Sequence, residues 1–259
     1  DIDERFGEFF GNDDLPTLKE EFLSTLKKDK DTDVEKHYQT LLPVFSEQEK
    51  EFVLKKGYKQ SSFLATELFD FYKKQNQPAE ALKYLQKYLK HHTDRDYMHP
   101  HYVNETLLRT YFEAAHSLNQ PIYDVAEAAV ASHLVNAEFF KTVAGYLPDR
   151  QQELEKVFKK KNRDEFFRYL SKQNRLAECL KMIQKKDVEE KTAFKFFAKH
   201  KKTVREEAEV YFLHRIDQNL TKSDSTCYKN VVDTLLELKE IAPEAAAEAL
   251  RIIRLQYKR

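Results

Sequence analysis

A helical hairpin that recurs along the chain limits the fold more than any other feature of this sequence. Residues 69–85 align without gaps to residues 167–183, and 8 of the 17 paired positions are identical. In both segments, two stretches with apolar residues at helical spacing flank a Gln-Asn pair. The related tripeptide Asn-Gln-Pro at residues 76–78 occurs again at residues 119–121. A chain that repeats such a unit is expected to stack antiparallel α-helices.

The rest of the sequence favours helices as well. It contains only 4 glycines and 7 prolines, too few for a many-stranded β protein or for the glycine-rich loops of most α/β enzymes. Ser46-Glu-Gln-Glu49 has the spacing of a capping box, and Pro78 stands where the first turn of a helix is expected. We therefore predict an all-α protein of about a dozen helices and no strand, built as an α-solenoid of stacked antiparallel hairpins.

Two regions are expected within this array. Residues 1–57 are predicted to form an N-terminal helical segment packed on the array, and residues 58–259 the array itself; one continuous domain is the alternative. Single hairpins cannot bury an apolar stripe alone, so stacking is expected to bury the stripes. The stripes of the last helices include Val210, Leu213 and Leu236.

Positive charge is concentrated in residues 150–205, which hold 18 basic and 8 acidic side chains, although the whole chain has 44 of each sign. In stacked hairpins this region can line one edge and attract a phosphate backbone or an acidic protein. The alternative is that these residues are solvated helix ends, where the helix dipole favours positive charge. The candidate binding residues are Lys159, Lys160, Lys161, Arg163, Lys199, Lys201, Lys202 and Arg205.

Residues 91–101 contain four histidines, and imidazole is a common ligand of zinc, copper and nickel. No two of them have the His-x-x-x-His spacing of a helical metal site, and Pro100 interrupts the segment. A polar loop between two helices is therefore the preferred interpretation, and no metal or cofactor is predicted. The alternative metal ligands are His91, His92, His99 and His101.

The sequence contains no known catalytic motif. A phosphate-binding loop, Gly-x-Ser-x-Gly and His-Glu-x-x-His are all absent. Two cysteines, Cys179 and Cys227, are too few for a disulfide framework, and Cys179 takes an alanine-like core position. We therefore predict a non-enzymatic protein of the cytoplasm. No run approaches the roughly 18 apolar residues that a membrane span needs, so no membrane association is expected.

One resemblance lies in the clearest hairpin. The segment Ala79-Glu-Ala-Leu-Lys-Tyr-Leu85 looks like the second helix of a tetratricopeptide repeat. The tryptophan and the Leu-Gly pair of that family's first helix are absent from this chain. The resemblance implies a TPR-like array of hairpins.

A second resemblance covers residues 210–259 and is centred on residues 228–240. This region is similar to the helical C-terminal region of bacterial SWIM zinc-finger proteins, in which a helical array follows a small Cys-x-Cys…Cys-x-His zinc module. The chain has no such ligand set, and because it begins at Asp1 rather than Met, we expect it to be a piece of a longer protein in which the module precedes Asp1. The resemblance implies an accessory interaction role or one associated with nucleic acid.

These features predict a non-catalytic helical module that binds a protein or peptide partner. The alternative is nucleic-acid binding through residues 150–205, as the helical part of a SWIM-type protein.

Overall fold

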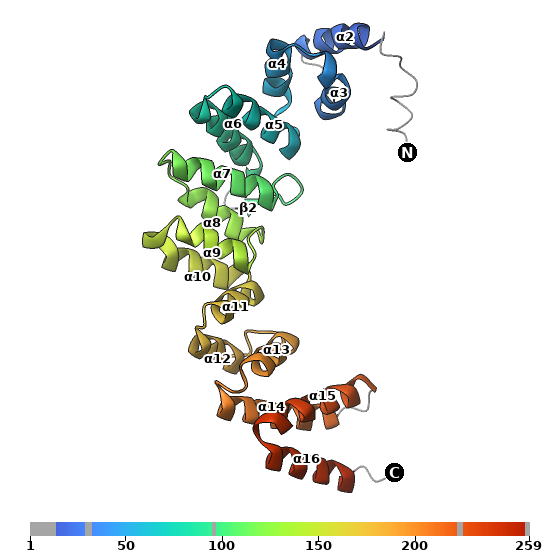
Figure 1. The fold of residues 1–259 in the computed structure, drawn as a ribbon, viewed down its shortest axis with the longest axis vertical. Helices are drawn as coiled ribbons and strands as arrows, with labels where there is room; N and C mark the ends of the chain where they lie inside the picture. Colours follow the sequence, from blue (N-terminus) through green and yellow to red (C-terminus); the bar gives the residue numbers. More distant parts are fainter. Residues whose placement is uncertain (1–13, 29–32, 95–96, 222–224, 257–259) are drawn as a thin grey trace. The chain divides into compact units, whose positions relative to one another are not determined.

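A computed structural model describes residues 14–28, 33–94, 97–221 and 225–256. Fifteen α-helices make up most of these residues, so the protein is all-α and built of helical hairpins, as predicted (Figure 1). The predicted absence of strands is wrong at one loop. There, the two-residue strands β1 (Thr93–Asp94) and β2 (Tyr97–Met98) pair in antiparallel fashion. The backbone N–H of Met98 also donates to Ser132 Oγ at 2.6 Å, which holds this loop on the helices.

The tertiary contacts divide the chain after Tyr169 into two units, and the boundary predicted near residue 57 falls inside the first. The first unit contains α2 (Leu15–Lys27), α3 (Val34–Leu41), the 3-10 helix η1 (Leu42–Val44), α4 (Glu47–Gly57), α5 (Ser62–Lys74), α6 (Pro78–His91), β1, β2, α7 (Glu105–Ser117), α8 (Tyr123–Ala131), α9 (Ala137–Gly145), the 3-10 helix η2 (Pro148–Arg150) and α10 (Gln151–Lys161). The division falls within α11 (Arg163–Lys172). The second unit continues with α12 (Leu176–Gln184), α13 (Glu190–His200), α14 (Arg205–Leu220), α15 (Ser225–Ile241) and α16 (Pro243–Gln256).

An asparagine turn ends a helix with the same backbone structure at three places in the chain. Asn76, Asn119 and Asn174 have positive φ angles of 59°, 51° and 57°. After the first of them, the N–H of Gln77 donates to the carbonyl of Tyr72 at 2.9 Å, and the equivalent bonds after the other two measure 2.8 and 3.0 Å. Asparagine adopts this left-handed conformation more readily than most residues, and the conformation ends a helix. The sequence repeat is therefore a repeat of helix ends.

The start and end of α4 follow from its sequence. Ser46 and Glu49 form the predicted capping box, in which the Ser46 N–H donates to Glu49 Oε2 at 2.7 Å. The last residue, Gly57, has no positive φ; it is needed because a Cβ atom there would lie 2.4 Å from Val34 Cγ1. This close approach packs α3 against α4.

Aromatic rings fill the core of the first unit. Phe140 is fully buried, with its ring centroid 4.3 Å from that of Phe158 and 4.9 Å from that of Tyr169. Phe158 and Tyr169 are buried as well. The aromatic side chains that the sequence repeats at helical spacing therefore supply the apolar interior of this unit.

Candidate functional site

The eight basic residues of the predicted binding surface are divided between the two units. In the first unit, Lys159, Lys160 and Lys161 form the last turn of α10, and Arg163 opens α11. All four side chains are exposed. The three lysines stand at a helix C-terminus, where the helix dipole favours positive charge, so the dipole accounts for them without a ligand.

In the second unit, Lys201 differs from the other predicted basic residues. Its Nζ forms ion pairs with Glu237 and, at 2.8 Å, with Glu240, and its side chain is only 12% exposed. Lys201 thus ties the connection between α13 and α14 to α15 and is engaged within the protein. The remaining three, Lys199, Lys202 and Arg205, are exposed.

The histidine segment is organised by packing of one of its members. His92 is buried, and its Nε2 donates to the carbonyl of Lys59 at 2.9 Å. Its ring contacts those of Tyr88 and Tyr102, each 4.4 Å away between centroids. Burial lowers the pKa of the imidazole. In the described parts of the chain, no three His, Cys, Asp or Glu side chains are grouped to hold a metal ion.

Both cysteines are buried, and they are not joined in a disulfide. Cys179 is fully buried, which confirms its predicted core position. Burial raises the pKa of its thiol to about 12, so the thiol stays protonated at neutral pH and does not act as a nucleophile there.

Helices α14 and α15 pack as an antiparallel pair through polar contacts. Asn230 Nδ2 donates to Asn219 Oδ1 at 3.3 Å, and one turn farther along, Arg215 Nη1 donates to Thr234 Oγ1. Residue numbers fall along one helix as they rise along the other, so the helices run in opposite directions. Arg215, Asn219 and Thr234 are all buried.

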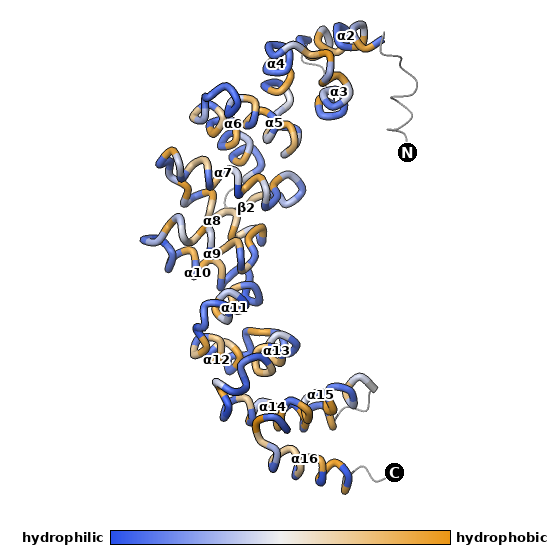
Figure 2. The backbone as a smooth tube through the Cα atoms, viewed as in Figure 1, coloured by the Kyte–Doolittle hydropathy of each residue, from blue (hydrophilic) through white to orange (hydrophobic). Residues whose placement is uncertain are grey.

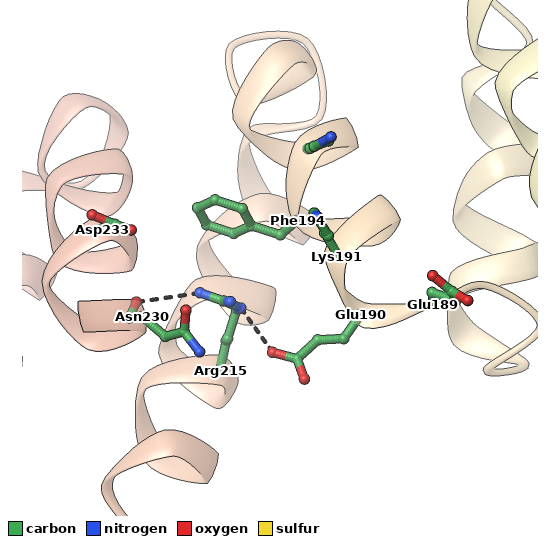
Figure 3. A pocket seen from close by; sticks show the side chains of 8 residues that line it. Glu189, Glu190, Lys191, Phe194, Arg215, Asn230 and Asp233 are labelled. Carbon is green, nitrogen blue, oxygen red and sulfur yellow. Dashed lines mark hydrogen bonds and ion pairs between the residues drawn. The ribbon is translucent and has the colours of Figure 1, made fainter. Parts of the chain in front are cut away.

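Arg215 lies where three helices of the second unit meet (Figure 3). Its Nε donates to Glu190 Oε1 on α13 at 2.9 Å, and its Nη1 donates to the carbonyl of Asn230 on α15 at 3.2 Å. The guanidinium also lies 4.3 Å from the centroid of the Phe194 ring. Because these partners occupy most of its donors, Arg215 acts first as a packing residue that joins α13, α14 and α15.

A cavity of about 610 Å³ lies beside this arginine. Side chains of both charges line it, and the guanidinium of Arg215 covers the ring of Phe194. It offers neither a serine or cysteine nucleophile nor a set of like charges that selects one kind of ligand. The lining residues are Glu189, Glu190, Lys191, Phe194, Lys195, Arg215, Asn230 and Asp233.

Large apolar side chains are exposed elsewhere on α14 and α15. On α15, Tyr228, Val232 and Leu236 are 51%, 55% and 60% exposed, and their spacing of four residues aligns them along one side of the helix. On α14, Val210 and Leu213 are 68% and 37% exposed. Figure 2 shows apolar residues at intervals along both helices. We call these five residues the apolar face.

The antiparallel register sets how the two helices align along their length. Since Arg215 contacts Thr234 and Asn219 contacts Asn230, Leu213 lies level with Leu236. Leu213 and Leu236 are each two residues from a contact residue of their own helix, which turns them about 160° away from the contact between the helices. The exposed apolar side chains therefore lie on the outer sides of α14 and α15.

The expectation that stacking buries these apolar stripes is therefore wrong for the apolar face. Helix α15 contacts α14 and α16, and neither neighbour covers its remaining apolar side. An excess of apolar residues over what one helix face can bury, as in residues 228–238, is the sequence signal for such a surface. For the polar contacts inside the helix pair, the sequence signal is Arg215, a charged residue at helical spacing from Phe212 and Asn219, which are buried.

None of the helices in the described residues is both long enough and apolar enough to cross a bilayer. No protein-family model, no curated protein and no solved structure matches the chain. The resemblances to tetratricopeptide repeats and to the helical region of SWIM proteins therefore stay predictions.

Proposed function

We propose that the protein is a non-catalytic α-helical module that binds a protein partner through the apolar face of α14 and α15. The observation that carries this proposal is the exposure of five large apolar side chains on the helix pair α14–α15, three of which form a stripe along α15. Contiguous exposed apolar surface is uncommon on proteins that act alone and marks contact surfaces. The two buried cysteines that form no disulfide agree with a cytoplasmic setting.

An amphipathic helix of the partner fits this face best. Tyr228 and Leu236 are separated by about 12 Å of helix, so about two turns of a partner helix would cover the stripe. Exposed residues of both charges lie near the stripe on α15, among them Lys229, Asp233 and Lys239. A partner helix with both signs of charge beside its apolar stripe would complement them.

The test starts from a variant of the apolar face. A partner captured from extracts of the source cells is purified, and its affinity is measured by isothermal titration calorimetry. Val232→Glu with Leu236→Glu should weaken binding at least about tenfold, because two charges would be buried against apolar surface. Wild-type binding should also show a negative heat-capacity change, which reports burial of apolar area.

The matched control is Gln173→Glu with Gln184→Glu, which adds the same two charges at exposed positions of the same unit. This control should bind like the wild type. A partner that binds the apolar-face variant and the wild type equally well would contradict the proposal.

Nucleic-acid binding is the second candidate, supported by the exposure of Lys159, Lys160, Lys161 and Arg163. It predicts that affinity for a labelled duplex or single strand falls steeply with salt and is lost when these four residues are changed to Gln. Fluorescence anisotropy at two salt concentrations measures both effects. Tight binding with this behaviour, together with an inert apolar face, would replace the protein-partner proposal.

A further inference from the structure

A cavity in the first unit is lined mainly by basic side chains. It has a volume of about 350 Å³ and lies where the end of α4 meets the last turns of α6. No carboxylate is among the lining residues, unlike those of the cavity beside Arg215. They are Tyr58, Lys59, Lys87, Lys90 and His91.

Two contacts fix the residues that follow α4 against α6. His92 Nε2 donates to the Lys59 carbonyl at 2.9 Å. The ring of Tyr58 packs edge-on against that of Tyr84, with 5.2 Å between centroids. Lys59 is therefore held beside Lys90 by packed elements, although the two are far apart in sequence. A site on such supports is preorganised, which limits the entropy lost when a ligand binds.

The positive charge at this cavity is not neutralised within the described residues. Neither Lys59 nor Lys90 takes part in an ion pair there. The carboxylates of α4 and α6 that are close to lysines are already engaged, Glu51 with Lys55 and Glu80 with Lys83. Like charges held together repel one another, and a bound anion would relieve that repulsion.

The aromatic rings beside the cavity pack against other side chains and are not open for stacking on a nucleobase. This favours a phosphoryl group over a nucleobase as the ligand. Tyr58 is buried. Tyr84 stacks on Tyr72 with 5.6 Å between centroids, and Lys87 Nζ lies 5.4 Å from the Tyr84 centroid. Binding of single-stranded nucleic acid relies on open ring faces that stack on bases. This cavity offers clustered charge without such faces.

We propose that the cavity lined by Lys59, Lys87, Lys90 and His91 binds a phosphorylated side chain of a protein partner. Ammonium groups are strong donors to phosphate oxygens, and clusters of basic residues are a common means of phosphopeptide recognition. The proposal rests on the proposed function in that the phosphoryl group belongs to a protein. It concerns the other unit, so the apolar face and this cavity can be tested separately.

The probe is a labelled pool of degenerate heptapeptides with phosphoserine at the centre, compared with the same pool without the phosphate. In fluorescence anisotropy at low salt, the full chain should bind the phosphorylated pool about tenfold more tightly. Inorganic phosphate should compete. Lys59→Gln with Lys90→Gln should lower the affinity for the phosphorylated pool about tenfold, since it removes two positive charges without touching a buried side chain.

The matched control is Lys73→Gln with Lys74→Gln, which removes the same charge at exposed positions of α5 and should leave binding unchanged. Val232→Glu with Leu236→Glu should also leave it unchanged, so this site and the apolar face can fail independently. Equal binding of both peptide pools, or undiminished binding by the Lys59/Lys90 variant, would overturn the proposal. Binding of an oligonucleotide that this variant loses, without phosphopeptide binding, would also overturn it and assign the cavity to nucleic acid.

Discussion

The two units differ in how many large apolar side chains they expose. Among the described residues, the first unit exposes only two large apolar side chains, Leu42 and Tyr102, whereas the second, although smaller, exposes eight. The second unit also buries three polar residues in the α14–α15 pair, Arg215, Asn219 and Thr234. This pair thus buries polar groups beside its apolar ones, while other apolar side chains lie on its surface.

This contrast indicates how each unit is stabilised. Aromatic rings in mutual contact fill the first unit, so its apolar residues are buried against one another within the unit. In the second unit, hydrogen bonds of Arg215 fix how α14 and α15 pair, and apolar residues are left for another molecule. Buried polar networks define one register of packing better than they add stability. A binding surface gains from such a fixed register.

The largest expected effect tests whether the first unit depends on its aromatic core. Phe140→Ala should lower the free energy of unfolding by about 3–5 kcal/mol, because it leaves a cavity between Phe158 and Tyr169. Urea unfolding followed by circular dichroism measures this loss. Leu236→Ala, on the apolar face, should change it by less than about 0.5 kcal/mol. Equal losses in both variants would show that Leu236 is buried in solution and would remove the contrast.

The second prediction tests the polar interior of the second unit. Arg215→Ala should lower the free energy of unfolding by about 2–3 kcal/mol, because Thr234 loses a donor and Phe194 loses the stacked guanidinium. Arg215→Met keeps the packing and should cost about half as much, since an apolar residue of similar size often replaces a buried charge at little cost. The same urea titration measures both variants.

Asn219→Ala is the informative control, because it removes a shorter side chain from the same helix pair. A smaller cost than that of Arg215→Ala is expected, since Arg215 contacts α13 as well as α15. If Arg215→Ala were as stable as the wild type, the pair would depend on apolar contacts, as the first unit does.

The fold could be predicted from the sequence because local rules determine it. The left-handed turns at Asn76, Asn119 and Asn174, and the capping box at Ser46, are set by a few adjacent residues. Such signals fix where helices begin and end. They do not fix which side of a helix meets a neighbour, and so the apolar stripe of α15 was expected to be buried.

The candidate sites depend on contacts between residues distant in sequence. Lys59 joins Lys90 because the His92 side chain bonds to the Lys59 backbone, and no spacing in the sequence indicates this bond. Conversely, the consecutive residues Lys159, Lys160 and Lys161 are conspicuous in the sequence, yet they lie in an ordinary last helical turn. Charge runs identify helix ends more readily than binding sites.

The smallest expected effect concerns pH and compares one histidine in each unit, the buried His92 and the half-buried His200. Burial lowers the pKa of both His92 and His200. Each therefore binds a proton more readily in the unfolded chain than in the folded protein, so stability falls as the pH drops below about 6.5, the pKa of an unperturbed histidine. Hydrogen bonds from Ser46 to Glu49 and from Lys55 to Glu51 lower the pKa of these carboxyls, so they titrate at lower pH than the histidines.

Urea midpoints at pH 7.5 and pH 5.5 measure this loss. His92→Gln should reduce the difference between the two pH values, because Gln can donate to the Lys59 carbonyl without taking up a proton. His200→Gln should reduce it less, since His200 is only partly buried, and His101→Gln, at an exposed position, should leave it as in the wild type. A wild type whose stability does not change between these pH values would mean that His92 is solvated, and the packing that holds Lys59 beside α6 would then be looser than the hydrogen bond indicates.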